Sequence, residues 1–292
     1  MRFGPFGRNR EMGGQPRARM SWKMRLIPLI LFAIYALYYF TAHQETVPLT
    51  GRSQLVDISR DQEMALGAQS YQEILSQSRV VPEGQVVDLV RTIGHSLAQA
   101  AADVDPGFEW EFNVIESQQA NAFALPGGKT AVYTGLLTVA ENPSGLAVVM
   151  GHEIAHAIAR HGAERLAHQK LVQIGTLAAS VALGDMDDDS QRMVMGALGV
   201  GAQYGVLLPF SREHESEADY MGLLFMAGAC FDPTEAPKLW ERMGEMSQGQ
   251  QTAEFMSTHP SHGTRIKQFQ EWMPEALALR EQHCSQSPPS SS

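Results

Sequence analysis

Two histidines and a glutamate within residues 151–156 have the types and the spacing of a metal-dependent hydrolytic site. His152 and His156 are four residues apart, so on a helix both imidazoles lie on one face and can bind the same zinc ion. Zinc lowers the pKa of a water molecule to about 7, and a neighbouring carboxylate can accept the proton as hydroxide attacks a peptide carbonyl. The motif therefore predicts a zinc peptidase with His152 and His156 as ligands and Glu153 as general base.

The residues that flank this motif argue against a chance occurrence on a solvated helix. Residues 146–150 and 157–159 are almost entirely apolar, which predicts that the helix is buried and that the histidines lie in a dry interior. Buried histidines beside a buried glutamate require a partner, and a metal ion is such a partner.

A third ligand has to come from elsewhere in the chain. A third histidine six residues after the second would fall at position 162, which is glycine, and His161 is interpreted as part of a charged helix end with a glycine stop. A later helix offers Glu215, with Asp219 one turn further on the same face. We predict that Glu215 is the third zinc ligand and that Asp219 orients a zinc-binding histidine through a hydrogen bond. Glu213 and Glu217 are interpreted as solvated helix charges.

The elements that have to position these residues are predicted to be mostly helical. Apolar residues recur at helical spacing over residues 61–76 and 85–101. Residues 110–115 alternate as in a strand, and residues 121–125 and 130–134, joined by a Pro-Gly-Gly turn, predict a β-hairpin. The predicted fold class is therefore α+β, mostly helical, with a small sheet.

Two further apolar segments, residues 171–184 and 193–210, are joined by an aspartate-rich stretch. The first is too short to span a bilayer, so the pair predicts a helical hairpin packed over the active site. A hairpin that dips into a membrane is the alternative, because glycine-rich faces also suit helix contacts in lipid.

The first 42 residues combine a basic segment with an apolar one. Residues 1–25 contain seven Arg or Lys and only Glu11, a charge of +6, whereas the whole chain carries −10, which leaves −16 for the rest. Residues 26–42 are uncharged and predict an uncleaved transmembrane signal anchor that keeps residues 1–25 in the cytoplasm and sends the rest across the membrane. A cleaved signal peptide and a mitochondrial transit segment are the alternatives.

Residues 43–284 are predicted to form a single domain, followed by a disordered tail at 285–292 that is rich in Ser and Pro. A chain of 292 residues that is 44% hydrophobic can bury a core of ample size, and the acidic body argues against a nucleic-acid partner. Cys230 and Cys284 are compatible with one disulfide in an oxidising compartment and equally with two unpaired thiols.

Four motifs give the chain a resemblance to a known family. They are Asn121 to Gly128 with Val132 to Leu137; Gly151 to His156 with Arg160 and His161; Ser211, Arg212, Glu215, Ala218 and Asp219; and Thr258, His259 and Pro260 with Arg265 and Ile266. Over most of residues 50–270 the chain resembles gluzincin zinc metallopeptidases of the HtpX and CAAX-prenyl-protease type, peptidase family M48, and among them the single-anchor periplasmic or mitochondrial inner-membrane members. The resemblance implies one zinc per chain, with Glu215 on a second helix as the third ligand.

The resemblance also implies two further parts of the site. In gluzincins an edge strand beside the zinc helix receives the substrate backbone by strand addition. The candidates for that edge are Asn121, Ala122, Phe123 and Ala124. His259 is expected on a loop near the zinc, where it could donate to the tetrahedral oxyanion or occupy the open metal position in a resting state. Arg265 is interpreted as structural.

Motifs and resemblance together predict a membrane-anchored zinc endopeptidase that acts on protein or peptide substrates, in particular misfolded or mislocalised envelope proteins. The expected location is the inner membrane of a bacterium with the catalytic domain in the periplasm, and the mitochondrial inner membrane is the alternative. The competing class of function is a membrane-tethered chaperone or scaffold with a latent zinc site. Glu153 favours catalysis, because a scaffold needs no general base. A prenyl-peptide protease is disfavoured by the single convincing span.

Overall fold

The computed structural model describes residues 22–183, 211–248, 254–259 and 264–285. These residues are mostly helical and contain two small sheets, which confirms the predicted fold class. In chain order the elements are α1 (Trp22–Ala42), β1 (Gln44–Thr46), β2 (Ser53–Leu55), α2 (Arg60–Ser76), β3 (Val80–Val81), α3 (Gln85–Ala100), β4 (Glu111–Ile115), β5 (Ala122–Leu125), β6 (Lys129–Tyr133), α4 (Leu136–Ala140), α5 (Pro143–Ile158), α6 (His161–Leu183), α8 (Arg212–Gly228), α9 (Glu235–Gln248), α10 (Glu254–Thr258) and α11 (Arg265–Cys284).

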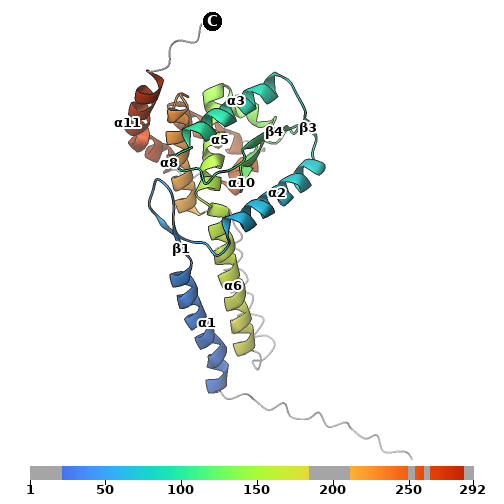
Figure 1. Ribbon diagram of the computed structural model, residues 1–292, viewed down its shortest axis with the longest axis vertical. Helices are drawn as coiled ribbons and strands as arrows, with labels where there is room; N and C mark the ends of the chain where they lie inside the picture. The colour runs from blue at the N-terminus through green and yellow to red at the C-terminus, as the bar shows by residue number, and fades with distance from the viewer. Residues whose placement is uncertain (1–21, 184–210, 249–253, 260–263, 286–292) are drawn as a thin grey trace, which may run out of the picture.

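The helix that carries the two histidines, α5, lies at the centre of the body, with α3, α8 and the larger sheet around it (Figure 1). It begins after Asn142, whose side chain accepts a hydrogen bond from the N–H of Gly145 at 2.9 Å, and Pro143 occupies its first turn. Every residue of α5 from Gly145 onward is buried. This confirms the prediction that the flanking apolar residues place the motif in the interior.

α5 and α8 cross where two glycines meet. A Cβ atom on Gly222 would lie 2.8 Å from backbone atoms of Gly151 and His152, so neither glycine can be replaced without separating the helices. Asp219 and Glu215 precede Gly222 by about one and two turns on the same face of α8. The glycine contact therefore sets the distance at which these two carboxylates meet the histidines of α5.

The larger sheet has the strand order β3-β4-β6-β5, which places β5 at an edge. β4 pairs with β6 in parallel, while β5 and β6 form an antiparallel hairpin with Ala122 opposite Val132 and Leu125 opposite Lys129. The hairpin turns through Gly127 and Gly128, whose φ angles of 84° and 82° favour glycine. The predicted strand, hairpin and edge position are all confirmed.

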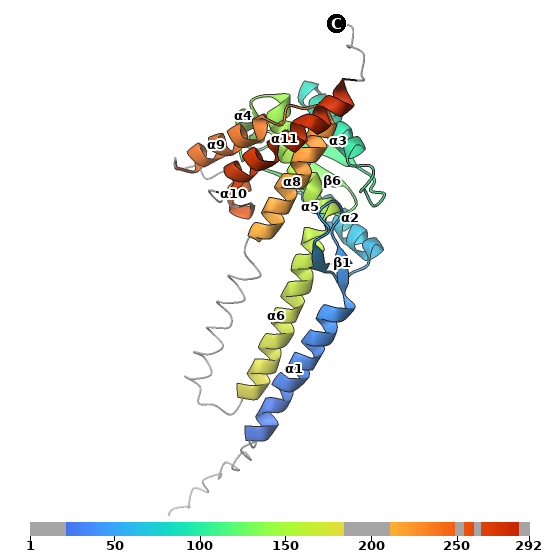
Figure 2. The same ribbon diagram turned by 90° about the vertical axis from the view of Figure 1, so that its left-hand side faces the viewer.

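α1 is the one helix among the described residues that is long and apolar enough to cross a membrane. Most of its side chains are exposed. It runs away from the body beside α6, as the two views show (Figures 1 and 2). The pair is tightly packed, because a Cβ atom on Gly175 of α6 would lie 2.8 Å from the ring of Phe32 on α1.

The course of α6 corrects the prediction for residues 171–184. Residues 171–183 do not pack over the active site but continue α6 away from the body along α1 (Figure 2). Residues 184–210, which include the second predicted arm, lie outside the described part of the chain.

The junction between α5 and α6 corrects a second interpretation. α5 ends at Ile158, but Gly162 is not a helix stop, because α6 has already begun at His161. Arg160 takes the left-handed conformation at the junction, with φ 60°, and it is buried rather than solvated. Its guanidinium is held by the carboxylates of Glu63 at 2.7 Å and Glu45 at 2.6 Å, which compensates for burying the charge.

Cys230 and Cys284 form a disulfide, so the disulfide alternative is confirmed. It joins the second residue after the end of α8 to the last residue of α11. α11 therefore lies along α8 and is covalently fixed to it at one end. Residues 286–292, most of the predicted tail, lie outside the described part of the chain.

Candidate active site

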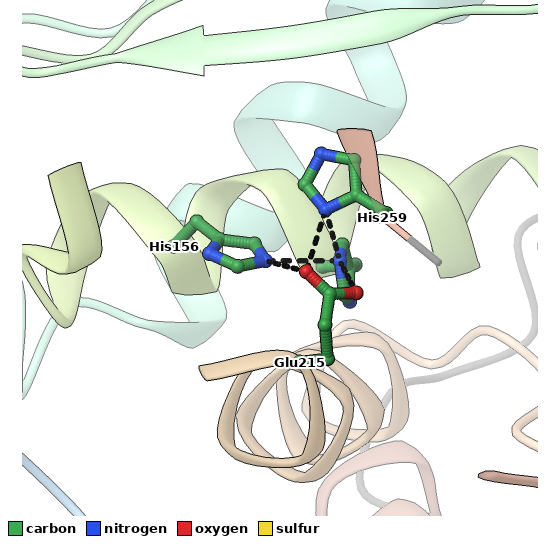
Figure 3. A group of neighbouring side chains, drawn as sticks. His156, Glu215 and His259 are labelled. Atoms are coloured by element: carbon green, nitrogen blue, oxygen red, sulfur yellow. Dashed lines mark hydrogen bonds and ion pairs between the residues drawn. The ribbon is translucent and has the colours of Figure 1, made fainter. Parts of the chain in front are cut away.

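Four buried side chains turn ligand atoms toward one point between α5 and α8. These are His152, His156, Glu215 and His259, and their ligand atoms all lie within 4.8 Å of one another. The Nε2 atoms of His152 and His156 are 3.0 Å apart, and the Glu215 carboxylate oxygens lie 3.5 and 3.4 Å from them. Figure 3 shows His156, Glu215 and His259 pointing toward one another from three elements of the chain.

Asp219 fixes the orientation of His152. The Nδ1 atom of His152 lies 3.0 Å from Oδ1 of Asp219, so Nδ1–H donates to the carboxylate and the Nε2 lone pair faces the cluster. Arg265 holds Asp219 in turn, with two N–O distances of 2.6 Å, and it also donates to Oε2 of Glu215 at 3.0 Å. The guanidinium stacks on the ring of Trp240 at 3.4 Å. The structural role predicted for Arg265 thus includes contacts to two of the predicted site carboxylates.

His156 is oriented by a different set of residues. Its Nδ1 lies 2.8 Å from Nδ1 of His161, whose Nε2 lies 2.9 Å from Oε2 of Glu217. Burial lowers the pKa of His161 to about 4 although Glu217 opposes this, so the ring is neutral. Because Glu217 accepts the Nε2–H of His161, Nδ1 of His161 is left to accept from His156. The Nε2 lone pair of His156 then also faces the cluster.

Interpreting Glu217 as a solvated charge was wrong, whereas Glu213 is exposed as predicted. Glu217 does lie on the opposite face of α8 from Glu215, but the loop between β1 and β2 covers that face, and Glu217 accepts hydrogen bonds from Thr50 and Arg52 of this loop. The local sequence around Glu217 contains no signal for this contact, because its partners lie more than 160 positions away.

Two imidazole lone pairs and a carboxylate that face one another in a dry interior require a positive charge between them. Without a metal that charge is a proton: burial alone would lower the pKa of His152, but its hydrogen bonds to Asp219 and Glu215 raise it to about 9. Donors bound at 2.0–2.1 Å around a tetrahedral zinc ion lie about 3.3 Å apart, close to the three separations given above. The donor set, two neutral imidazoles and one carboxylate, therefore fits a zinc ion.

Glu153 lies between this cluster and the sheet edge. Its Oε2 accepts a hydrogen bond from the N–H of Ala124 at 3.2 Å, and its Oε1 lies 3.3 Å from Nε2 of His259. Burial raises the pKa of Glu153, which increases the affinity of the carboxylate for a proton. A proton acceptor is thus placed beside both the candidate metal position and the edge strand.

The predicted edge residues present backbone rather than side chains to the site. The N–H of Ala124 points away from β6, and the N–H of Ala122 is bonded by the side-chain oxygen of Asn121 at 2.9 Å. Phe123 points to the sheet face, where its ring contacts Tyr71 and Tyr133. This geometry suits recognition of a peptide backbone.

His259 reaches the cluster from the end of α10. Its Nδ1 lies 2.9 Å from Oε1 of Glu215 and 3.2 Å from Nε2 of His152. The ring is buried and stacks on Phe255, with centroids 4.5 Å apart. Nδ1 of His259 therefore lies where a fourth metal ligand would be.

Comparison with known proteins shows which family the chain belongs to. Residues 87–273, more than half of its length, match Peptidase family M48. The chain belongs to peptidase family M48. The resemblance drawn from the motifs is thereby confirmed, and with it the prediction that the chain is a metalloendopeptidase, as the named relatives are.

This M48 peptidase is 38% identical over 257 residues to the mitochondrial metalloendopeptidase OMA1 of Schizosaccharomyces pombe, covering 86% of this chain and 72% of the relative. It is 32% identical over 273 residues to human mitochondrial metalloendopeptidase OMA1, covering 89% of this chain and 52% of the relative. With the beta-barrel assembly-enhancing protease of Yersinia pestis it shares 28% identity over 228 residues, covering 76% of this chain and 46% of the relative. The chain thus spans about half the length of the last two relatives.

Proposed function

We propose that this chain is a membrane-anchored zinc endopeptidase in which His152, His156 and Glu215 bind one zinc ion and Glu153 is the general base. The observation that carries the proposal is the convergence of two oriented imidazole lone pairs and a carboxylate on one buried point beside Glu153. When bound, zinc would polarise the peptide carbonyl and lower the pKa of water.

The side chains around that point have separate tasks. Glu153 accepts a proton from water at one carboxylate oxygen and returns it to the leaving nitrogen, while the N–H of Ala124 holds the other oxygen. Asp219, fixed by Arg265, keeps the Nδ1 proton of His152 in place, so that Nε2 stays a ligand.

The substrate class that we propose is unfolded or misfolded protein at the membrane. A peptide that adds to the outer edge of β5, which pairs with no other strand among the described residues, is bound by its backbone, which requires no particular side chain. A groove of about 330 Å³ opens where β5 ends, and its lining includes the apolar side chains of Leu66, Leu125 and Leu166. Apolar segments, which folded proteins bury, suit this groove. A chaperone or scaffold would not require a proton acceptor at the position of Glu153.

We infer that residues 26–42 span the membrane, that residues 1–25 stay in the cytoplasm and that residues 43–284 form the catalytic domain on the other side. The charge of +6 before the apolar helix and −16 for the rest supports this orientation. The disulfide is compatible with an oxidising compartment, the periplasm of a bacterium. The mitochondrial inner membrane is the alternative, and several relatives are named as mitochondrial.

A topology experiment tests this orientation. A reporter fused after residue 284 is expected on the far side of the membrane and one fused before residue 20 in the cytoplasm, because moving six net positive charges across is unfavourable. The protein should also resist carbonate extraction. Recovery of a soluble protein that begins near His43 would show instead that residues 1–42 are a cleaved signal peptide.

A second experiment concerns His259, which we propose caps the metal in a resting state. His259→Ala is then expected to raise peptide hydrolysis, because the fourth coordination position becomes open. If His259 instead donates to the oxyanion, turnover should fall about 100-fold with substrate binding nearly unchanged. Steady-state kinetics separate these outcomes. Turnover and half-saturation equal to those of the parent would remove His259 from the site.

A further inference from the structure

The hairpin that directly follows the anchor helix contributes a partly buried arginine to the back of the metal site. β1 and β2 pair antiparallel over residues 44–46 and 53–55, and Arg52 lies in the loop between them. Its side chain is only 17% exposed, although arginine is usually a surface residue. The guanidinium binds both oxygens of Glu164 on α6, at 3.0 and 2.8 Å, and Oε2 of Glu217 on α8 at 2.8 Å. One loop side chain thus joins two helices of the catalytic body.

Glu217 is held on several sides by donors. Nε of Arg52 donates to Oε2, the hydroxyl of Thr50 donates to Oε1, and Nε2 of His161 donates to Oε2 at 2.9 Å. A carboxylate bound by three donors has a fixed position and a fixed set of accepting lone pairs. His161, which is fully buried, is therefore fixed in both ring orientation and tautomer, and its Nδ1 faces Nδ1 of His156 at 2.8 Å.

The other histidine of the motif is held in a similar way. Nδ1–H of His152 donates to the carboxylate of Asp219, which is paired with the buried side chain of Arg265. Nδ1 of His156 donates to His161, and His161 donates to Glu217, a carboxylate that is paired with Arg52. In both cases an arginine that is distant in the sequence holds a carboxylate in place, and that carboxylate determines the orientation of the histidine.

We propose that Arg52 is a positioning residue for the metal site: through Glu217 and His161 it holds His156 with its Nε2 lone pair toward the metal, so that the hairpin attached to the membrane anchor determines metal affinity. This inference rests on the proposed function only in taking His156 as a metal ligand. Groups that hydrogen-bond to metal-binding histidines typically change metal affinity 10- to 100-fold when mutated.

The first test measures zinc affinity, by competition with a chromophoric chelator, in the full-length detergent-solubilised protein. Arg52→Gln is expected to weaken zinc binding about 10-fold. Arg79→Gln is the matched control, because Arg79 pairs with Glu116 on the surface, where its side chain is 82% exposed, and it should leave zinc affinity unchanged. Zinc affinity of Arg52→Gln equal to that of the parent would overturn the proposal.

A double-mutant cycle separates positioning from general destabilisation, because Arg52→Gln also leaves two buried carboxylates without their cation. We call the chain of contacts from Arg52 through Glu217 and His161 to His156 the relay. In a His161→Ala background the relay is already broken, so adding Arg52→Gln should change zinc affinity less than about twofold. An equal weakening in both backgrounds would show that Arg52 acts on the fold and not through His161. Arg52→Lys should recover part of the lost affinity, since the positive charge returns to Glu217.

A milder variant keeps the proposal testable if Arg52→Gln does not fold. Thr50→Val removes one donor to Glu217 without unpairing a charge and should weaken zinc binding by a smaller factor, about threefold. An unchanged affinity there would count against the relay. Glu215→Ala is measured in the same assay. If this variant binds zinc with parental affinity, the proposed zinc site itself is wrong. If it loses zinc while the Arg52 and Thr50 variants keep parental affinity, only the inference about Arg52 is refuted.

Discussion

Glu153→Gln is expected to keep the fold and the bound zinc while lowering peptide hydrolysis by about 10²- to 10⁴-fold, the usual contribution of general acid–base catalysis. The amide has the shape of the carboxylate, and its oxygen can still accept the hydrogen bond from the N–H of Ala124. It cannot accept a proton from water. This variant should therefore contain as much zinc as the parent protein but hydrolyse peptides far more slowly.

The measurement uses purified full-length protein, an unfolded casein-like substrate, and metal analysis of the same sample. Chelator should abolish cleavage by the parent, and added zinc should restore it. Glu213→Gln is the control, because Glu213 is an exposed carboxylate of α8 outside the cluster, and it should cleave at the parental rate. If Glu153→Gln cleaves at the parental rate, another group accepts the proton. If it loses zinc, Glu153 holds the metal.

The second large effect concerns the metal itself. His152→Ala, His156→Ala and Glu215→Ala should each lose zinc or bind it about 100-fold or more weakly, because each removes one of the three permanent bonds that we propose between the protein and the ion. Metal analysis after dialysis against a weak chelator measures this directly. The folded state of each variant is checked by circular dichroism, since loss of the fold would also remove the metal.

Glu217→Ala discriminates between the two faces of α8. Glu217 lies behind His161 and not in the cluster, so this variant should still bind one zinc per chain when zinc is in excess, with an affinity reduced in the way expected for Arg52→Gln. The assignment of Glu215 as the ligand would be refuted by the reverse pattern, in which Glu217 is essential for zinc and Glu215 is dispensable.

The sequence was sufficient to predict those parts of the site that depend on spacing within one element. His152 and His156 share a face because they are four residues apart on a helix, and the same rule brings Glu215 and Asp219 together. The hairpin of β5 and β6 followed from its glycine turn, whereas the edge position of β5 was implied by the resemblance to gluzincins. In each case the determining contacts lie within one helix or one hairpin.

The parts that were predicted wrongly depend on contacts between distant segments. Glu217 and His161 look like ordinary charged positions until the hairpin that carries Arg52 covers them, and no local periodicity encodes that docking. The prediction of a helix stop at Gly162, in the α5–α6 junction, was wrong for a related reason. Glycine is the usual residue in a left-handed conformation, but here Arg160 adopts it, and ion pairs with Glu45 and Glu63 hold its buried side chain.

The side-by-side course of α1 and α6 sets the height of the candidate metal site above the bilayer if α1 spans it. Tyr39, near the end of α1, packs against Ala167 and Leu171 of α6, and His156 lies eleven positions before Ala167. If α1 spans the membrane, α6 holds the site outside the lipid, so an extended substrate has to protrude from the bilayer before its backbone reaches Glu153. With this proposed topology, we expect the length of the segment that emerges from the lipid to decide whether a membrane protein can be cut.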